Sequence, residues 1–143
     1  MSDDAQTVIK TLLTTNWTNS NTDSITPSIN LIYDVKEFGG LGQPKSYVLI
    51  GTNGGEQTRY VGMGSNDDEV IKPVMVDIRT EVSRSHALKC RNEVLRILKA
   101  NDLHPDADND LIKLVRNNEL SDKRRNLWRW KLDFEVYDYK KSY

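Results

Sequence analysis

Three aspartates in the stretch DADND are spaced like the first ligands of a calcium-binding loop. Asp106, Asp108 and Asp110 occupy the first, third and fifth positions of such a loop. The stretch then departs from the pattern, because Leu111 stands where glycine makes the sharp turn and Asn117 stands where a bidentate glutamate closes the site. We therefore predict a solvated acidic loop and assign no metal ligands.

A second pair of residues has metal-binding side chains at helical spacing. His86 and Cys90 are four residues apart and would share one side of a helix. Two ligands do not complete a zinc site, and His104 lies beyond the expected end of that helix. We expect Cys90 to pack inside the protein and His86 to remain partly exposed.

Charged residues alternate in the stretch VDIRTEV. Asp77, Arg79 and Glu81 would therefore share one face of a strand. This pattern invites comparison with metal-dependent nucleases, but the acidic-x-lysine pair of such sites is missing. We interpret these three residues as an ion-paired face turned to solvent or to a neighbouring subunit.

Other catalytic patterns are incomplete. The glycine groups GGLGQPK, GTNGGEQ and GMGS match neither the phosphate-binding loop nor the dinucleotide fingerprint, so we interpret them as turns. Ser83, Ser85 and the two histidines show no nucleophile spacing, although a triad in space cannot be tested from one sequence. We predict no catalytic residues, no cofactor and no enzymatic activity.

Basic and aromatic residues lie close together near the C-terminus, as they do in proteins that stack nucleic-acid bases. The basic residues are Lys123, Arg124 and Arg125, and the aromatic residues are Trp128 and Trp130. Both tryptophans, however, alternate with polar residues and fall on the apolar side of a strand. We assign them to the core or an interface, and nucleic-acid binding stays an alternative function.

The first half of the chain combines one helix with several short strands. Residues 4–16 have apolar side chains at helical spacing, and residues 29–35 and 46–50 have the pattern of strands. The dipeptide Asn53-Gly54 favours a hairpin turn that leads into a strand at residues 58–63. Residues 64–69 are then expected to form a polar loop.

In the second half, the period of the apolar residues changes from two to about 3.6 near Val82, so a strand is followed by a helix. Ser83 or Ser85 could cap this helix and Asn101 fits its end. We expect Leu95 on its buried side, so that Leu95→Ala would cost about 2–5 kcal/mol. Residues 111–115 and 126–139 follow as strands. The predicted fold is α+β, a mainly antiparallel sheet of about five to six strands packed against one long helix, plus an N-terminal helix.

Length and composition define the class of protein. The 143 residues are 37% hydrophobic and 29% charged, with a net charge of −1, which suits one domain over residues 1–143 and gives no global attraction to nucleic acid. We expect flexible loops at about 18–28, 37–45 and 101–110. The single cysteine excludes an intramolecular disulfide, and the sequence contains neither a signal peptide nor a stretch that could span a membrane.

The order of these elements resembles the tail-terminator, or tail-completion, family of tailed phages and archaeal tailed viruses. The resemblance covers nearly the whole chain. It depends on an N-terminal helix, a β-meander with a long glycine-rich loop, a strand carrying VDIRTEV, the helix HALKCRNEVLRIL and a closing pair of strands that ends in WRWKLDFEV. It implies a structural virion protein without cofactor that forms a ring, typically of six copies, and is assembled in the host cytoplasm. The ring would cap the tail tube, join it to the neck connector and let DNA pass. Another neck, connector or minor tail protein is the alternative within the virion.

Exposure and shape, rather than a family motif, indicate where neighbouring subunits would meet. Mobile glycine-rich loops, charged strand faces and basic loops are suited to subunit contacts. The predicted interface residues are Phe38, Gly40, Leu41, Pro44, Asp77, Arg79, Glu81, Lys123, Arg124 and Arg125.

Overall fold

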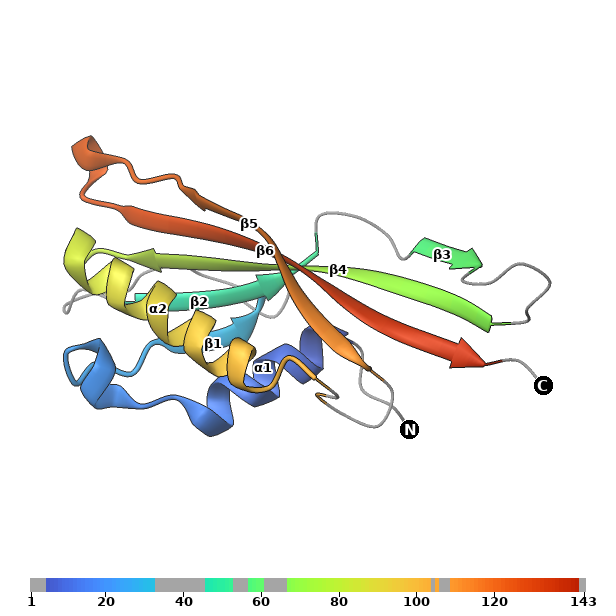
Figure 1. The fold of residues 1–143 in the computed structure, drawn as a ribbon. Helices are drawn as coiled ribbons and strands as arrows, with labels where there is room; N and C mark the ends of the chain where they lie inside the picture. The colour runs from blue at the N-terminus through green and yellow to red at the C-terminus, as the bar shows by residue number, and fades with distance from the viewer. Residues whose placement is uncertain are drawn as a thin grey trace.

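The computed structural model describes residues 5–32, 46–52, 57–60, 67–103, 105 and 109–141. Along the chain, α1 (Ala5–Asn16) and the short helix η1 (Asn19–Thr22) precede four strands. These strands are β1 (Ser28–Leu31), β2 (Ser46–Gly51), β3 (Gln57–Tyr60) and β4 (Asp67–Thr80). Helix α2 (Arg84–Ala100) follows, and β5 (Leu111–Glu119), the short helix η3 (Lys123–Arg125) and β6 (Trp128–Lys141) end the fold (Figure 1).

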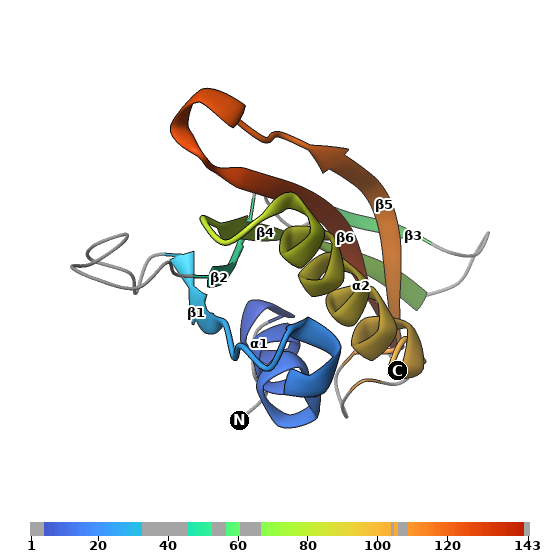
Figure 2. The ribbon, with the colours of Figure 1, turned by 90° about the vertical axis from the view of Figure 1, so that its left-hand side faces the viewer.

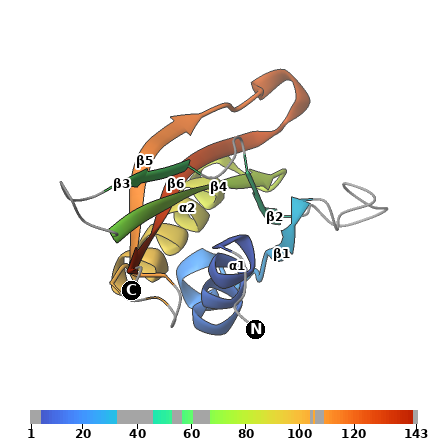
Figure 3. The ribbon, with the colours of Figure 1, turned by 90° about the vertical axis from the view of Figure 1, so that its right-hand side faces the viewer.

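Two long antiparallel strands form the centre of the sheet. Strands β4 and β6 have 14 residues each and pair along their whole length, from Asp67 opposite Lys141 to Thr80 opposite Trp128. The continuous path of the sheet is β1-β2-β4-β6-β5, and β3 pairs with the first half of β4, beyond the end of β2. Both α1 and α2 lie on one face of this sheet (Figures 2 and 3).

Alternation along β4 and β6 places the core between the sheet and the helices. Val74, Val76 and Ile78 lie opposite Phe134, Leu132 and Trp130, and all six are buried. The apolar face predicted for residues 128–136 is therefore part of the core. From the helices, buried Ile9, Leu13, Ala87, Val94, Ile97 and Leu98 join the same cluster.

The predicted fold needs correction in its helical layer and in its sheet. The prediction was one long helix plus an N-terminal helix, but both helices are short, with 17 residues in α2 and 12 in α1, and they share the layer. The sheet is mixed and its continuous path has five strands, because β1 runs parallel to β2. A parallel pair needs a crossover connection instead of a tight turn, and residues 33–45, which connect these strands, lie outside the described residues.

The expected β-meander, with a hairpin between residues 46–50 and 58–63, does not form among the described strands. β1 runs parallel to β2, and β2 and β3 both pair with β4. The sequence pattern predicts a loop at residues 67–69, but these residues begin β4. Pro73 made this long strand hard to predict from the sequence, since proline is rare in central strands. Its location explains why it is tolerated: β2 pairs from Met75 onwards and β3 pairs up to Ile71, so Pro73 lies between the two partner strands.

Candidate interface and buried polar network

The charged face of β4 is built around one buried carboxylate. Asp77 is fully buried and accepts hydrogen bonds from both of its arginine neighbours. Arg129 donates from Nε to Oδ1 at 2.9 Å and from Nη2 to Oδ2 at 2.8 Å, while Arg79 donates from Nε and Nη2 to Oδ2 at 3.1 and 2.9 Å. The hydrogen bonds that Arg129 donates to Asp77 raise the pKa of Arg129 above its ordinary value.

The carboxylate of Asp77 offsets the repulsion between two opposed arginines. Arg79 and Arg129 lie directly opposite each other on β4 and β6, and like charges in that position repel. The carboxylate of Asp77 bridges the two guanidinium groups, so the trio carries one net positive charge. Asp77 itself is hidden, whereas Arg79 and Arg129 keep about a quarter of their side chains exposed, 27% and 29%. Only the arginines of this trio remain accessible on the face of the sheet opposite the helices.

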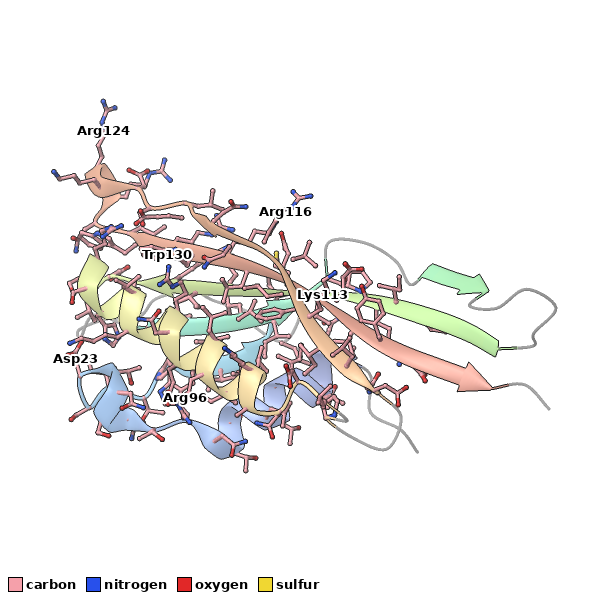
Figure 4. The ribbon with its side chains drawn as sticks, in the orientation of Figure 1. Asp23, Arg96, Lys113, Arg116, Arg124 and Trp130 are labelled. Atoms are coloured by element: carbon pink, nitrogen blue, oxygen red, sulfur yellow. The ribbon has the colours of Figure 1, made fainter. Side chains whose placement is uncertain are left out.

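The predicted basic loop forms the tip of the β5–β6 hairpin. Lys123, Arg124 and Arg125 form η3 and are exposed. The side chain of Asp122 caps this helix by accepting from the backbone N–H of Arg124 at 3.1 Å. Figure 4 shows Arg124 and Arg116 pointing away from the body of the protein on the outer side of this hairpin.

An ion pair and two ring contacts connect this hairpin to α2. Arg84, the first residue of α2, donates from Nε and Nη2 to Glu119 at 2.9 and 3.1 Å. These hydrogen bonds lower the pKa of Glu119 and raise that of Arg84. The guanidinium carbons of Arg84 and Arg91 also lie 5.2 and 5.5 Å from the ring centre of Trp130. Trp130 is therefore a buried anchor covered by arginines and cannot stack on a base.

The other predicted interface residues are only partly described. Glu81 is exposed, close to the hairpin tip, and its carbonyl accepts from Asn126 Nδ2 at 3.1 Å. Phe38, Gly40, Leu41 and Pro44 lie outside the described residues, so their assignment stays a prediction. Asp77, Arg79, Glu81 and the tip residues all come from the end of the sheet where β4 ends and β6 begins.

A polar chain that the sequence did not reveal joins β2, β4, α2 and the residue after η1, and it is buried except at Asp23, whose side chain is 40% exposed. His86 Nε2 lies 2.8 Å from Ser46 Oγ, which lies 2.9 Å from Thr80 Oγ1, and His86 Nδ1 lies 3.1 Å from Asp23 Oδ2. The expectation that His86 is partly exposed is wrong, because its side chain is fully buried. The three residues that form this chain with His86 are not its neighbours along a helix or strand, so no local sequence pattern could predict these contacts.

Serine, histidine and aspartate in this order resemble a nucleophilic triad, but their surroundings oppose catalysis. Ser46 and His86 are both buried, and the Ser46 hydroxyl is shared with Thr80. Lys89 binds the other oxygen of Asp23, and hydrogen bonds from Lys89 and His86 lower the pKa of Asp23. We interpret the chain as a clamp that fastens the segment after η1 to α2.

Glu93, about two turns after His86 on α2, fastens the residues at the start of η1 and within it. It is buried and accepts from the backbone N–H of Thr18 at 2.6 Å and from Asn21 Nδ2 at 3.1 Å. Arg96 donates to both of its oxygens, at 2.6 and 3.0 Å. Burial alone would raise the pKa of Glu93, but these hydrogen bonds outweigh burial and lower it below its ordinary value.

The residues with metal-binding side chains that were weighed in the sequence do not gather into a site within the described part of the chain. Cys90 Sγ lies 3.5 Å from His86 Nε2, but among the described residues no three His, Cys, Asp or Glu side chains form a group suited to a metal. Cys90 is buried as expected, and burial raises the pKa of its thiol to about 12, so it stays protonated at neutral pH. Asp106 and Asp108 of the calcium-like loop lie outside the described residues.

Comparison with known proteins gives a likeness to a solved structure. No protein-family model and no curated protein matches the chain. Among solved structures, it is similar to a chain in the structure titled "Virion of native gene transfer agent (GTA) particle", with 12% sequence identity, a TM-score of 0.65 and 95% of each chain covered. The chain has the fold of a component of that virion. At this identity the likeness establishes the fold, and it includes both helices and the sheet because nearly the whole of each chain is covered. None of the described helices has the length and apolar character needed to cross a bilayer.

Proposed function

We propose that the chain is a structural virion protein, and more specifically a tail-terminator or tail-completion subunit. In this role several copies, typically six, form a ring that caps the tail tube and joins it to the neck connector. The protein works through its surfaces and is not an enzyme, which agrees with the closed surroundings of Ser46 and His86. It belongs in the tail and neck region of the particle.

The observation that carries this proposal is the likeness in fold to a virion component over 95% of both chains. The order of elements in the sequence points independently to the tail-terminator family. The two arguments use different properties, since the first depends on the arrangement in space and the second on the order of elements along the sequence and the strand-to-helix junction from Val76 to Leu98. The finer assignment to the tail terminus comes from the second argument alone.

A stop codon early in the gene of the encoding virus tests this proposal. We expect DNA-filled heads and separate tails in electron micrographs, and joined particles when the protein is supplied from a plasmid. An antibody carrying gold should label wild-type particles at the head–tail junction. Label elsewhere on the particle would leave a virion protein but refute the terminator role, and normal particles that lack the protein would refute both.

One observation favours nucleic-acid binding as a second candidate. Residues 111–131 contain seven Lys and Arg against two Asp and Glu, a net charge of +5 in a chain whose total is −1. Such a basic hairpin can contact phosphates without base stacking. A stable monomer with salt-dependent affinity for duplex DNA, reduced by Arg124→Ala, would support this function over the ring.

A further inference from the structure

Strand β5 ends the sheet with an uncovered edge. Its first two residues are covered, because Leu111 pairs with Leu103 and the backbone N–H of Ile112 donates to the carbonyl of Asp102 at 2.8 Å. From Lys113 onwards, β6 is the only described strand that pairs with β5. Residues 113–120 are all exposed. A strand edge of this kind presents backbone donors and acceptors to another chain.

The same segment carries apolar side chains that a soluble monomer normally hides. Leu114, Val115 and Leu120 are 41%, 45% and 46% exposed, and they are three of the four large apolar side chains that are markedly exposed in the described structure. Leu114 also lines a groove of about 560 Å³ between β5 and the end of α2, together with Leu95, Leu98 and Phe134. Natural proteins protect long apolar edges with charges, bulges or a partner.

β5 has a bulge between Leu114 and Arg116 and carries several charges. Because bulges and charges prevent non-specific edge-to-edge pairing, this edge is suited to a specific contact. The charges also indicate the partner. Residues 111–131 carry +5, so the remainder of the chain carries −6. The hairpin of one molecule is therefore attracted to the rest of another copy, which is a heterologous contact.

The topology supplies the complementary edge. β1 lies at the opposite end of the strand path, and among the described strands it pairs only with β2. Joining β5 of one copy to β1 of the next would continue the sheet from copy to copy. Because both helices lie on one face of the sheet (Figures 2 and 3), every copy would place its helices on the same side, and a rotation that closes would give a ring.

We propose that the β5 edge, residues 113–120, is the surface that binds a second copy of this chain, with the β1 edge, Ser28–Leu31, as its counterpart. The inference deepens the proposed function and rests on it, since it names the contact by which ring subunits would join. Duplex DNA is the competing occupant of the same basic hairpin.

Cross-linking between two differently labelled copies tests this contact. One copy carries Val115→Cys on the β5 edge and the other carries Asn30→Cys on β1. A short bis-maleimide reagent tolerates small differences in register. The natural Cys90 is buried and protonated at neutral pH, so it contributes little background. The control replaces Asn30→Cys with Thr14→Cys, an exposed position on α1.

We expect a product of twice the mass from the Val115→Cys and Asn30→Cys mixture, several-fold more abundant than from the Thr14→Cys control. Adding Leu120→Lys to the β5 copy should reduce the product while the melting temperature stays unchanged. Equal yields in the test and control mixtures would overturn the inference, and so would a protein that stays monomeric at its solubility limit.

Two outcomes separate this inference from the proposed function. If light scattering shows an oligomer but the two thiols do not cross-link, the copies join elsewhere and the ring role survives. If duplex DNA, and not a second copy, protects the thiol introduced by Val115→Cys from maleimide, the edge binds nucleic acid. That result would overturn the inference, whereas the location of the protein in particles would still decide the proposed function.

Discussion

Asp77 shows how one residue can hold two strands together at the candidate interface. Its carboxylate neutralises one of two opposed arginines and occupies the donors of both. We predict that Asp77→Asn, which keeps the shape but removes the charge, lowers the free energy of unfolding by about 3 kcal/mol, because breaking a buried ion pair leaves a charge uncompensated. Urea denaturation measures this change.

Lys123→Ala is the matched control, because Lys123 is exposed at the hairpin tip. Its effect on the free energy of unfolding should stay within about 0.5 kcal/mol. If Asp77→Asn were as stable as Lys123→Ala, the two arginines would not depend on the carboxylate as the geometry suggests.

At the same scale, the sequence identified apolar positions better than buried polar ones. His86 and Glu93 have the side chains of an exposed helix surface, yet both are buried against the segment around η1. A helix covered on one side by a sheet has one apolar stripe, and that is the pattern expected here. Because a second segment covers α2, its buried arc is wider, and hydrogen bonds from distant residues satisfy the polar side chains within it.

At the scale of elements, helix α2 offers a direct test of how the two layers pack. Ile97 is 1% exposed within the core, whereas Leu95 is only partly buried and lines the groove beside β5. We predict that Ile97→Ala costs about 2–5 kcal/mol through a buried cavity. The sequence predicted the same cost for Leu95→Ala. We now expect Leu95→Ala to lower the free energy of unfolding by clearly less than Ile97→Ala does, because the site of Leu95 is already open to water.

Thermal and urea denaturation of the two variants, measured side by side, would check this order. A larger loss for Leu95→Ala than for Ile97→Ala would show that the groove is closed in solution, by rearrangement of β5 or by a second copy. Repeating the comparison at low protein concentration separates these two explanations, since only the second depends on concentration.

The sequence predicted the elements better than their pairing. The change of period near Val82 located the end of β4 and the start of α2, and Ser83 caps α2 by accepting from His86 N at 3.0 Å. The parallel pairing of β1 with β2 has no local cause, because it depends on where a distant connection brings the chain. The start of β4 could not be predicted, because acidic residues and Pro73 are unusual in a central strand. Pro73 is tolerated there because β2 and β3 pair with the same edge of β4 one after the other, on either side of it.

On the scale of the whole molecule, polar contacts rather than apolar burial fasten residues 18–23 to α2. Glu93 holds Thr18 and Asn21, and Asp23 binds His86 and Lys89. Both carboxylates have pKa values below their ordinary values, which are 4.5 for Glu93 and 3.8 for Asp23. This attachment therefore requires both groups to be ionised, and it links the N-terminal part of the fold to pH.

The sign of the pH effect follows from these lowered pKa values. A group that binds protons less readily when folded stabilises the protein above its unfolded pKa, and this stabilisation is lost as pH falls through the folded pKa. The attachment should thus be intact at neutral pH and weaken progressively below 4.5, the ordinary value for Glu93. In NMR spectra the Thr18 amide, which donates to Glu93, should lose its protection from hydrogen exchange before the amides of β4 and β6 do. In Glu93→Gln the attachment should be weak already at neutral pH, and the dependence of the melting temperature on pH below 4.5 should flatten. A Thr18 amide that stays protected in step with the central strands as the solution is acidified would show that apolar packing, and not the ionised carboxylates, holds this segment in place.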